Sequence, residues 1–356
     1  MKYLFFYFIL LNLVIAAYIR LDCSSYLAKM AISHFNECNT RNLDKVMYVL
    51  IIAFSTFLII SFVIKMPRTS NFHLGLLSNQ RKSGYLVVAI LSWCGIAFIY
   101  RIIVFTGFSV SGLRGITYTL AGTLLPLLIY TKISTRVALG KHNSLLFLPA
   151  VLIVSLLFLT KTFLLYYFAA SIIKISHQKN NTRRLIKLVL LIFFVIIVYN
   201  MINFSRGYFS NSADVEFTSI LMFLMKIVVR ILIVDQILWS FNLVDEYVVR
   251  SVVDLTLASN LKLMAFGYVK GTFGFSHSIF GPLPAVYGYG VVPIIVILLY
   301  TFLMTFCSML RINQGSIYIF PVGLQIVNNG MNLQTTLLMA SMVATAVLYK
   351  LKVVKL

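Results

Sequence analysis

Single basic residues interrupt the apolar sequence at scattered positions, and these side chains are the best suited to chemistry. Arginine and lysine bind phosphate groups and stabilise negative charge on a departing diphosphate. Isolated cations also serve as anchors that extend to lipid headgroups, which is the plainer interpretation for most of them. The candidates are Arg101, Arg114, Lys161, Arg206, Lys226, Arg230, Arg250, Lys262 and Lys270.

Two places favour anion binding over a simple anchor. Lys226 and Arg230 are four residues apart, so a helix stacks them on one face, whereas Asp235 turns to a different face. Arg206 directly follows an apolar run and precedes a glycine that permits close approach of the backbone. We expect Arg206 and Arg230 to be the main diphosphate contacts. Supporting contacts are expected from Arg114, Lys226, Arg101 and Lys161.

A hydroxyl nucleophile would need a proton acceptor near the same surface. His277, which lies just before an apolar segment, and Asp235 are the candidate catalytic residues. A histidine at such a position is more often only hydrogen-bonded at the membrane surface. The alternative carboxylates are Asp214, Glu216, Asp245 and Glu246. The last two are equally compatible with a solvated loop corner or with an ion pair to Arg250.

Composition places the chain in a membrane. Of its 356 residues 60% are hydrophobic and only 11% are charged, whereas soluble domains are about 45–50% apolar. The net charge of +21 does not indicate nucleic-acid binding, because the cations lie in short loops beside apolar segments rather than on one polar face. The sequence also lacks a phosphate-binding loop, a dinucleotide fingerprint, a zinc motif and a serine-nucleophile motif, so we expect no cofactor and no metal.

The pattern predicts an all-α polytopic membrane protein with about ten transmembrane helices. In this arrangement the cytoplasmic segments hold 17 of the 30 Lys and Arg residues and no acidic residue, and all nine carboxylates lie on the opposite side. The positive-inside rule then puts both termini in the cytoplasm. The predicted spans cover residues 3–19, 46–64, 85–105, 115–131, 145–160, 162–176, 185–203, 287–306, 317–332 and 333–349.

The chain reads as a single membrane domain, residues 1–356, with one large outer loop at about 204–290 between the seventh and eighth spans. Within the loop, residues 220–241 are apolar but carry three charges, each costly at a bilayer centre. We therefore expect an amphipathic or partly buried helix over the outer mouth of the bundle. Cys23 and Cys38 share the first outer loop and could form a disulfide if that compartment is oxidising.

This layout resembles the Wzy family of O-antigen and oligosaccharide repeat-unit polymerases. The resemblance rests on the number of spans, the late outer loop, the scattered outer arginines and a glycine-proline-aromatic stretch at 280–290, FGPLPAVYGYG. It implies a glycosyltransferase of the GT-C type in the bacterial inner membrane, with its active site facing the periplasm. Its substrate would be an undecaprenyl-diphosphate-linked glycan. Its partners would be membrane lipids and a Wzz-type chain-length regulator, and we expect no nucleic-acid partner.

Three other functions compete with repeat-unit polymerisation, and the ligase fits the same layout best. An O-antigen ligase uses the same donor with a different acceptor. A lipid-linked oligosaccharide flippase or another transporter would be expected to carry charges deep within several spans, to keep its loops short and to show repeat symmetry. A membrane-bound acyltransferase would need a histidine among its spans, whereas His73, His142 and His177 fall in basic loops.

Overall fold

The protein is an α-helical membrane protein whose helices coincide with the apolar segments of the sequence. The computed structural model describes residues 2–25, 40–63, 84–107, 111–138, 147–158, 160, 162–176, 181–210, 233–246, 278–309, 315–330 and 332–350. Within these ranges the regular structure is entirely helical. The chain packs as two compact units, one of residues 1–67, 221–305 and 322–336 (unit 1) and one of residues 68–220, 306–321 and 337–356 (unit 2).

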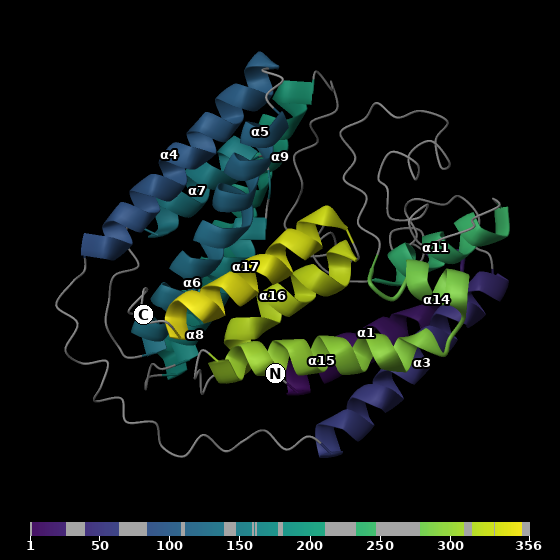
Figure 1. The fold of residues 1–356 in the computed structure, drawn as a ribbon. Helices are drawn as coiled ribbons and strands as arrows, with labels where there is room; N and C mark the ends of the chain where they lie inside the picture. Colours follow the sequence, from purple (N-terminus) through teal and green to yellow (C-terminus); the bar gives the residue numbers. More distant parts are fainter. Residues whose placement is uncertain are drawn as a thin grey trace. The chain divides into compact units, whose positions relative to one another are not determined.

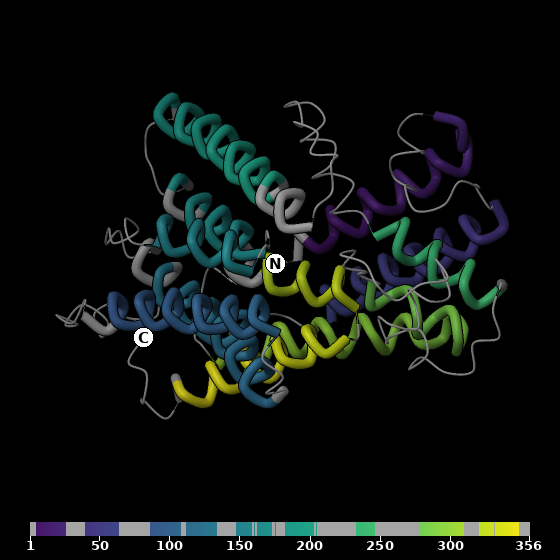
Figure 2. The backbone as a smooth tube through the Cα atoms, turned by 90° about the horizontal axis from the view of Figure 1, so that it is seen from above, coloured from purple at the N-terminus to yellow at the C-terminus, as the bar shows by residue number. Residues whose placement is uncertain are grey.

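Unit 1 gathers helices from both ends of the chain (Figure 1). The helices α1, α3 and α11 lie side by side in both views (Figures 1 and 2), and α14 packs on α11. Aromatic rings join α1 to α3, with Phe6 and Phe54 centroids 4.8 Å apart. The bounds are α1 Lys2–Leu21, α3 Thr40–Val63, α11 Val234–Glu246, α14 Pro282–Tyr287, most of α15 Val291–Met309 and the second half of α16 Gly315–Asn329.

Unit 2 is built from the central helices and most of the last one. Its bounds are α4 Gly84–Thr106, α5 Ser111–Thr119, η2 Leu120–Leu124, α6 Leu125–Ala138, α7 Phe147–Phe158, α8 Thr162–Ser176, α9 Asn181–Ser210 and most of α17 Leu333–Lys350. The short π-helix η2 joins α5 to α6, and the indole N–H of Trp93 donates to the carbonyl of Ala121 within it, at 2.7 Å. This bond links a widened turn to α4 deep in the unit.

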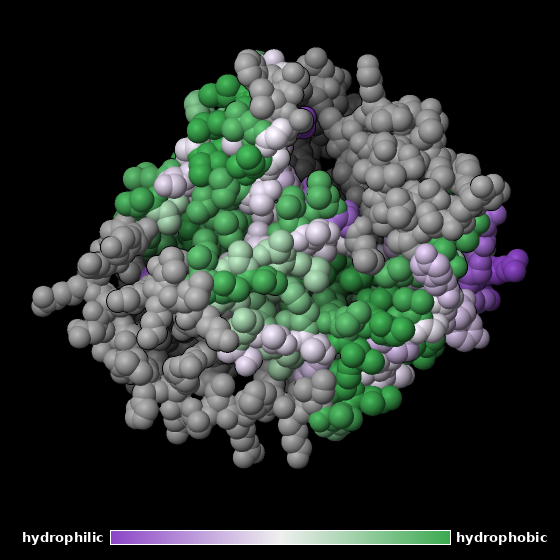
Figure 3. All heavy atoms as spheres, viewed as in Figure 1, coloured by the Kyte–Doolittle hydropathy of each residue, from purple (hydrophilic) through white to green (hydrophobic). Residues whose placement is uncertain are grey.

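Each predicted span overlaps a helix in order, so the positions of the apolar helices are confirmed. Among the described residues, five helical stretches are long and apolar enough to cross a bilayer, at 40–63, 86–106, 112–133, 182–202 and 291–309. Many of their apolar side chains face outward; Phe62, for example, is 78% exposed. Figure 3 shows apolar residues over α4 and α15. Such outward apolar surface is what lipid contact requires. The count of ten spans and their orientation stay predictions.

The structure differs from the predicted bounds at two places that matter for function. The helix α9 continues past the predicted end of the seventh span, residue 203, to Ser210, because no proline lies between them and the single glycine there does not end the helix. The predicted helix at 220–241 is confirmed only from Val234 and extends further, to Glu246. Its part before Ile233 lies outside the described residues.

Candidate functional site

The polar end of unit 1 is the best-defined cluster of charged and aromatic side chains in the described part of the protein. It brings together the end of α1, the start of α3, the end of α11 and the turn before α15. On α3, Lys45 and Tyr48 are three residues apart, and on α11, Phe241 and Asp245 are four apart, so each pair shares a helix face. Figure 3 shows hydrophilic residues gathered at this end of unit 1.

Lys45 connects the charged and aromatic parts of the cluster. Its ammonium Nζ lies 2.8 Å from Oδ2 and 3.0 Å from Oδ1 of Asp245, and 5.5 Å from the ring centroid of Phe241. The Tyr289 ring is next to Phe241, with centroids 6.4 Å apart, and next to Tyr48, at 6.0 Å. Five side chains from three separate segments thus form one continuous surface.

Buried amides hold the helices beneath this surface. The Nδ2 of Asn42 on α3 donates to Oδ1 of Asn242 on α11 at 2.6 Å. The Oδ1 of Asn12, in the middle of α1, accepts from the backbone N–H of Ile233 at 2.7 Å, while its Nδ2 donates to the carbonyl of Phe8. The first N–H groups of an α-helix have no partner inside the helix. Asn12 therefore fixes the start of α11 on α1.

Electrostatics keep the carboxylate of Asp245 ionised. Partial burial acts to raise its pKa, but hydrogen bonds from Lys45 and Asn42 and the charges of Lys45 and Arg41 outweigh this, so the pKa lies below its usual value. For Tyr289, burial and the neighbouring Tyr48 and Asp245 raise the pKa, so its phenol stays protonated at neutral pH. A second ion pair, between Nε of Arg20 and Oδ1 of Asp44 at 2.8 Å, links α1 to α3 nearby.

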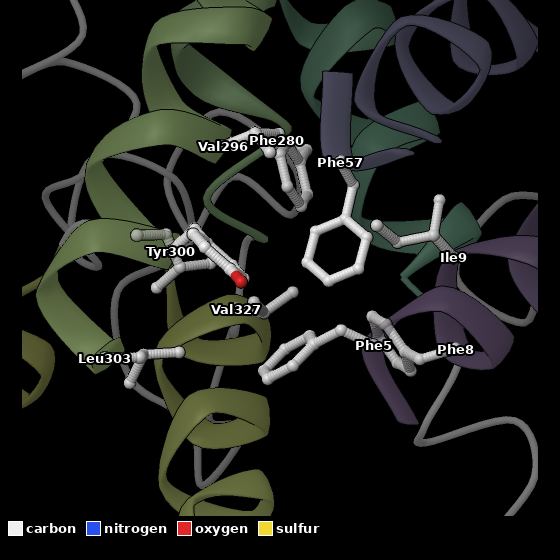
Figure 4. A pocket seen from close by; sticks show the side chains of 10 residues that line it. Phe5, Phe8, Ile9, Phe57, Phe280, Val296, Tyr300, Leu303 and Val327 are labelled. Atoms are coloured by element: carbon white, nitrogen blue, oxygen red, sulfur yellow. The ribbon is translucent and has the colours of Figure 1, made fainter. Parts of the chain in front are cut away.

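Unit 1 also contains a small apolar cavity (Figure 4). Its volume is about 20 Å³, enough for about one water molecule. Tyr300 is 2% exposed and its hydroxyl points into this space, where no described residue hydrogen-bonds it. With no other polar group on its walls, the cavity offers a water too few partners. The lining residues are Phe5, Phe8, Ile9, Phe57, Phe280, Val296, Leu299, Tyr300, Leu303 and Val327.

Two of the predicted anion contacts lie in unit 2, on either side of one turn. Arg101 is on α4, five residues before the helix ends, and Arg114 is near the start of α5, which packs against α4. The side chain of Arg114 is exposed and that of Arg101 is partly buried. The structure thus brings their helices together, as expected for residues flanking a short connection.

The other predicted residues fall at dispersed places. Arg206 lies just beyond the apolar stretch 182–202, as predicted, in the part of α9 that continues past it, four residues before the helix ends. Asp235 lies in the first turn of α11, where a negative carboxylate interacts favourably with the helix dipole. It is ten residues from Asp245 on the same helix, a rise of about 15 Å. His277, Lys161, Lys226 and Arg230 lie outside the described residues, as do Arg250, Asp214 and Glu216.

Sequence reasoning missed the partner of Asp245. A proton acceptor, a loop corner and a pair with Arg250 were the alternatives for this carboxylate. In the structure Asp245 lies in the last turn of α11 and pairs with Lys45, 200 positions away. It also assigned no role to Tyr48, Phe241 or Tyr289. The sequence spacing indicates that Lys45 shares a helix face with Tyr48, and Phe241 with Asp245. No sequence pattern indicates that these two faces meet.

One of the two cysteines of the first predicted outer loop forms a disulfide. Cys23, just after α1, is disulfide-bonded, whereas Cys94 and Cys307 are free. Cys38 lies outside the described residues. A disulfide at this end of α1 fits an oxidising compartment.

Comparison with known protein families, with curated proteins and with solved structures finds no match to this chain.

Proposed function

We propose that this protein is a membrane glycosyltransferase that polymerises lipid-diphosphate-linked oligosaccharide units on the non-cytoplasmic face. The donor chain would be transferred to a sugar hydroxyl of a second lipid-linked unit, and the lipid diphosphate would leave. The undecaprenyl lipid, the inner membrane and the GT-C class follow from the resemblance to the Wzy polymerases. The proposal needs neither a nucleotide nor a metal.

One observation carries the proposal: four charged groups that were predicted on the outer side come together at one end of unit 1. Arg20, Asp44, Lys45 and Asp245 were all assigned to outer segments by charge distribution, and the structure links them by ion pairs that join α1 to α3 and α3 to α11. A bundle that presents its polar groups at one end is suited to a substrate with a lipid tail and a polar head. The outer arginines would hold the diphosphate, and His277 or an outer carboxylate would accept the proton.

The test is a reconstitution with purified components. Protein in detergent is incubated with undecaprenyl-diphosphate-linked repeat units, without nucleotide or metal, and the products are resolved on a gel. A ladder of longer glycans together with released undecaprenyl diphosphate supports the proposal. Its absence, with correctly folded protein and native repeat units, overturns polymerisation.

The competing functions give different products in the same system. A ligase would transfer the glycan only when a separate lipid acceptor is supplied, and it would make one product rather than a ladder. A flippase would move labelled lipid-linked glycan across proteoliposomes without changing its length. Proteoliposomes that carry the substrate on one leaflet therefore distinguish the three activities.

A further inference from the structure

The polar end of unit 1 is nearly balanced in charge. Among the side chains that the structure describes there, Arg20 pairs with Asp44 and Lys45 pairs with Asp245. Arg41 lies close enough to Asp245 to lower its pKa, and Asp22 accepts from the hydroxyl of Ser24. Cations that already face carboxylates at 2.8 Å give no strong positive field for a diphosphate. The described side chains at this end are therefore poorly suited to bind the diphosphate itself.

The same surface is rich in groups that recognise a neutral polar molecule. The carboxylate of Asp245 accepts hydrogen bonds, the ammonium of Lys45 and the phenols of Tyr48 and Tyr289 donate them, and all four residues are at least partly accessible. Such convergent donors and acceptors beside aromatic faces give a ligand orientation and specificity.

The two tyrosine rings pack against each other and are nevertheless exposed to solvent. Tyr48 is 58% exposed and Tyr289 is 36% exposed, although their ring centroids are only 6.0 Å apart. Phe241 is 4% exposed and fixes Tyr289 from below. Two exposed rings held in place by a buried third form a platform with a defined geometry.

We propose that Tyr48, Tyr289, Lys45 and Asp245 form a binding site for a neutral sugar ring, the acceptor end of the glycan. The C–H face of the ring would lie on the tyrosines, while its hydroxyl groups would bond to Lys45 and Asp245. That the bound sugar is the acceptor of the reaction rests on the proposed function. The binding of a sugar at this place does not depend on catalysis. We thus assign the sugar, and not the diphosphate, to this cluster of side chains.

Tyr287 provides a matched control. It is 62% exposed, lies at the end of α14 only two residues before Tyr289, and forms no ring pair with Tyr48 or Phe241 among the described contacts. Tyrosines at membrane surfaces often serve only as interfacial anchors. If Tyr48 and Tyr289 are such anchors, Tyr287→Leu should behave as Tyr48→Leu does.

The probe is a printed array of bacterial surface oligosaccharides free of lipid, incubated with tagged protein in detergent. We expect the wild type and Tyr287→Leu to bind the same glycans, and Tyr48→Leu and Tyr289→Leu to lose binding at least about tenfold, which is about 1.4 kcal/mol. Thermal melting and size-exclusion profiles of all four proteins check their folding. A further variant, Asp245→Asn, leaves the tyrosine rings in place and should also weaken glycan binding.

Each other outcome overturns the inference. If the wild type binds no glycan, if both tyrosine variants bind normally, or if all three variants lose binding equally, the tyrosines are not a sugar platform. The proposed function fails separately, when the wild type makes no ladder from lipid-linked repeat units whatever the array shows. A working polymerase with normal KM for the acceptor in Tyr48→Leu would overturn only the sugar site.

Discussion

Lys45 on α3 and Asp245 on α11 form an ion pair across 200 residues of sequence, with Nζ 2.8 Å from Oδ2. The Lys45 side chain is 21% exposed and that of Asp245 is 40% exposed. The pair therefore lies between the buried amides of Asn42 and Asn242 and the exposed tyrosine rings. It connects the packing of unit 1 to the surface on which we place the sugar.

Removal of this pair should cost little stability but should show coupling between the two residues. A double-mutant cycle with Lys45→Met and Asp245→Asn should give a coupling energy of about 0.5–1 kcal/mol, because solvent screens a pair that is this exposed. Thermal melting in detergent measures it. A coupling near zero would mean that the two side chains do not attract each other in solution.

The contribution of Asp245 should also depend on pH. Its folded-state pKa lies below the ordinary value of 3.8, so its stabilisation is present above that pH and is lost as the pH falls through the folded pKa. The difference in melting temperature between wild type and Asp245→Asn should thus be constant near neutral pH and shrink on acidification below about pH 4. A difference that grows on acidification would contradict this assignment.

Replacing Asn12 should destabilise unit 1. Asn12 and Ile233 are both fully buried, and Asn12→Ala leaves the Ile233 N–H without its acceptor, at a cost of about 1–3 kcal/mol. The control is Asn200→Ala, because Asn200 is only partly buried and donates to a carbonyl of its own helix, that of Ile196. Equal melting temperatures for the two variants would argue against the α1–α11 contact.

Gly281 should not tolerate a side chain. An added Cβ would collide with Oγ of Ser240, and it would lie 3.3 Å from the carbonyl of Gln236. We expect Gly281→Ala to cost about 1–3 kcal/mol and Ser240→Ala to recover part of that loss. Gly95→Ala is the control, because a Cβ there has nothing within 4 Å and favours the helix. Failure of Ser240→Ala to improve Gly281→Ala would place the clash elsewhere.

Removing the hydroxyl of Tyr300 should stabilise the protein or leave its stability unchanged. A buried polar group without a hydrogen-bond partner costs about 1–3 kcal/mol, and Tyr300→Phe removes that group while the ring stays. Its ring still packs edge-on against Phe57, with centroids 5.6 Å apart. Tyr7→Phe, at a site 61% exposed, is the neutral control. A clear loss of stability in Tyr300→Phe alone would reveal a partner for the hydroxyl.

The outer arginines should be needed for activity rather than for folding. Arg206→Ala and Arg230→Ala should abolish polymer in the reconstituted assay while expression stays normal, because each removes a proposed diphosphate contact. Lys270→Ala is the control, because it also removes one positive charge and should have little effect on polymer. Normal polymer from Arg206→Ala would remove that residue from the diphosphate role.

Much of the helical layout followed from hydropathy, because a transmembrane helix must satisfy its backbone internally and show apolar side chains all round. The overlap of every predicted span with a helix, from α1 to α17, reflects that constraint. Helix ends were less predictable. α9 continues through Arg206 to Ser210 because a span can extend into water without a breaker.

The sequence by itself determined the all-helical class and the places of the apolar helices. Only the tertiary structure paired Lys45 with Asp245, Asn12 with Ile233 and Tyr48 with Tyr289. The physical reason is that local spacing fixes which side chains share a helix face. Which faces then meet depends on packing between segments hundreds of residues apart, such as α3 and α11, and a single sequence carries no periodic signal for that choice.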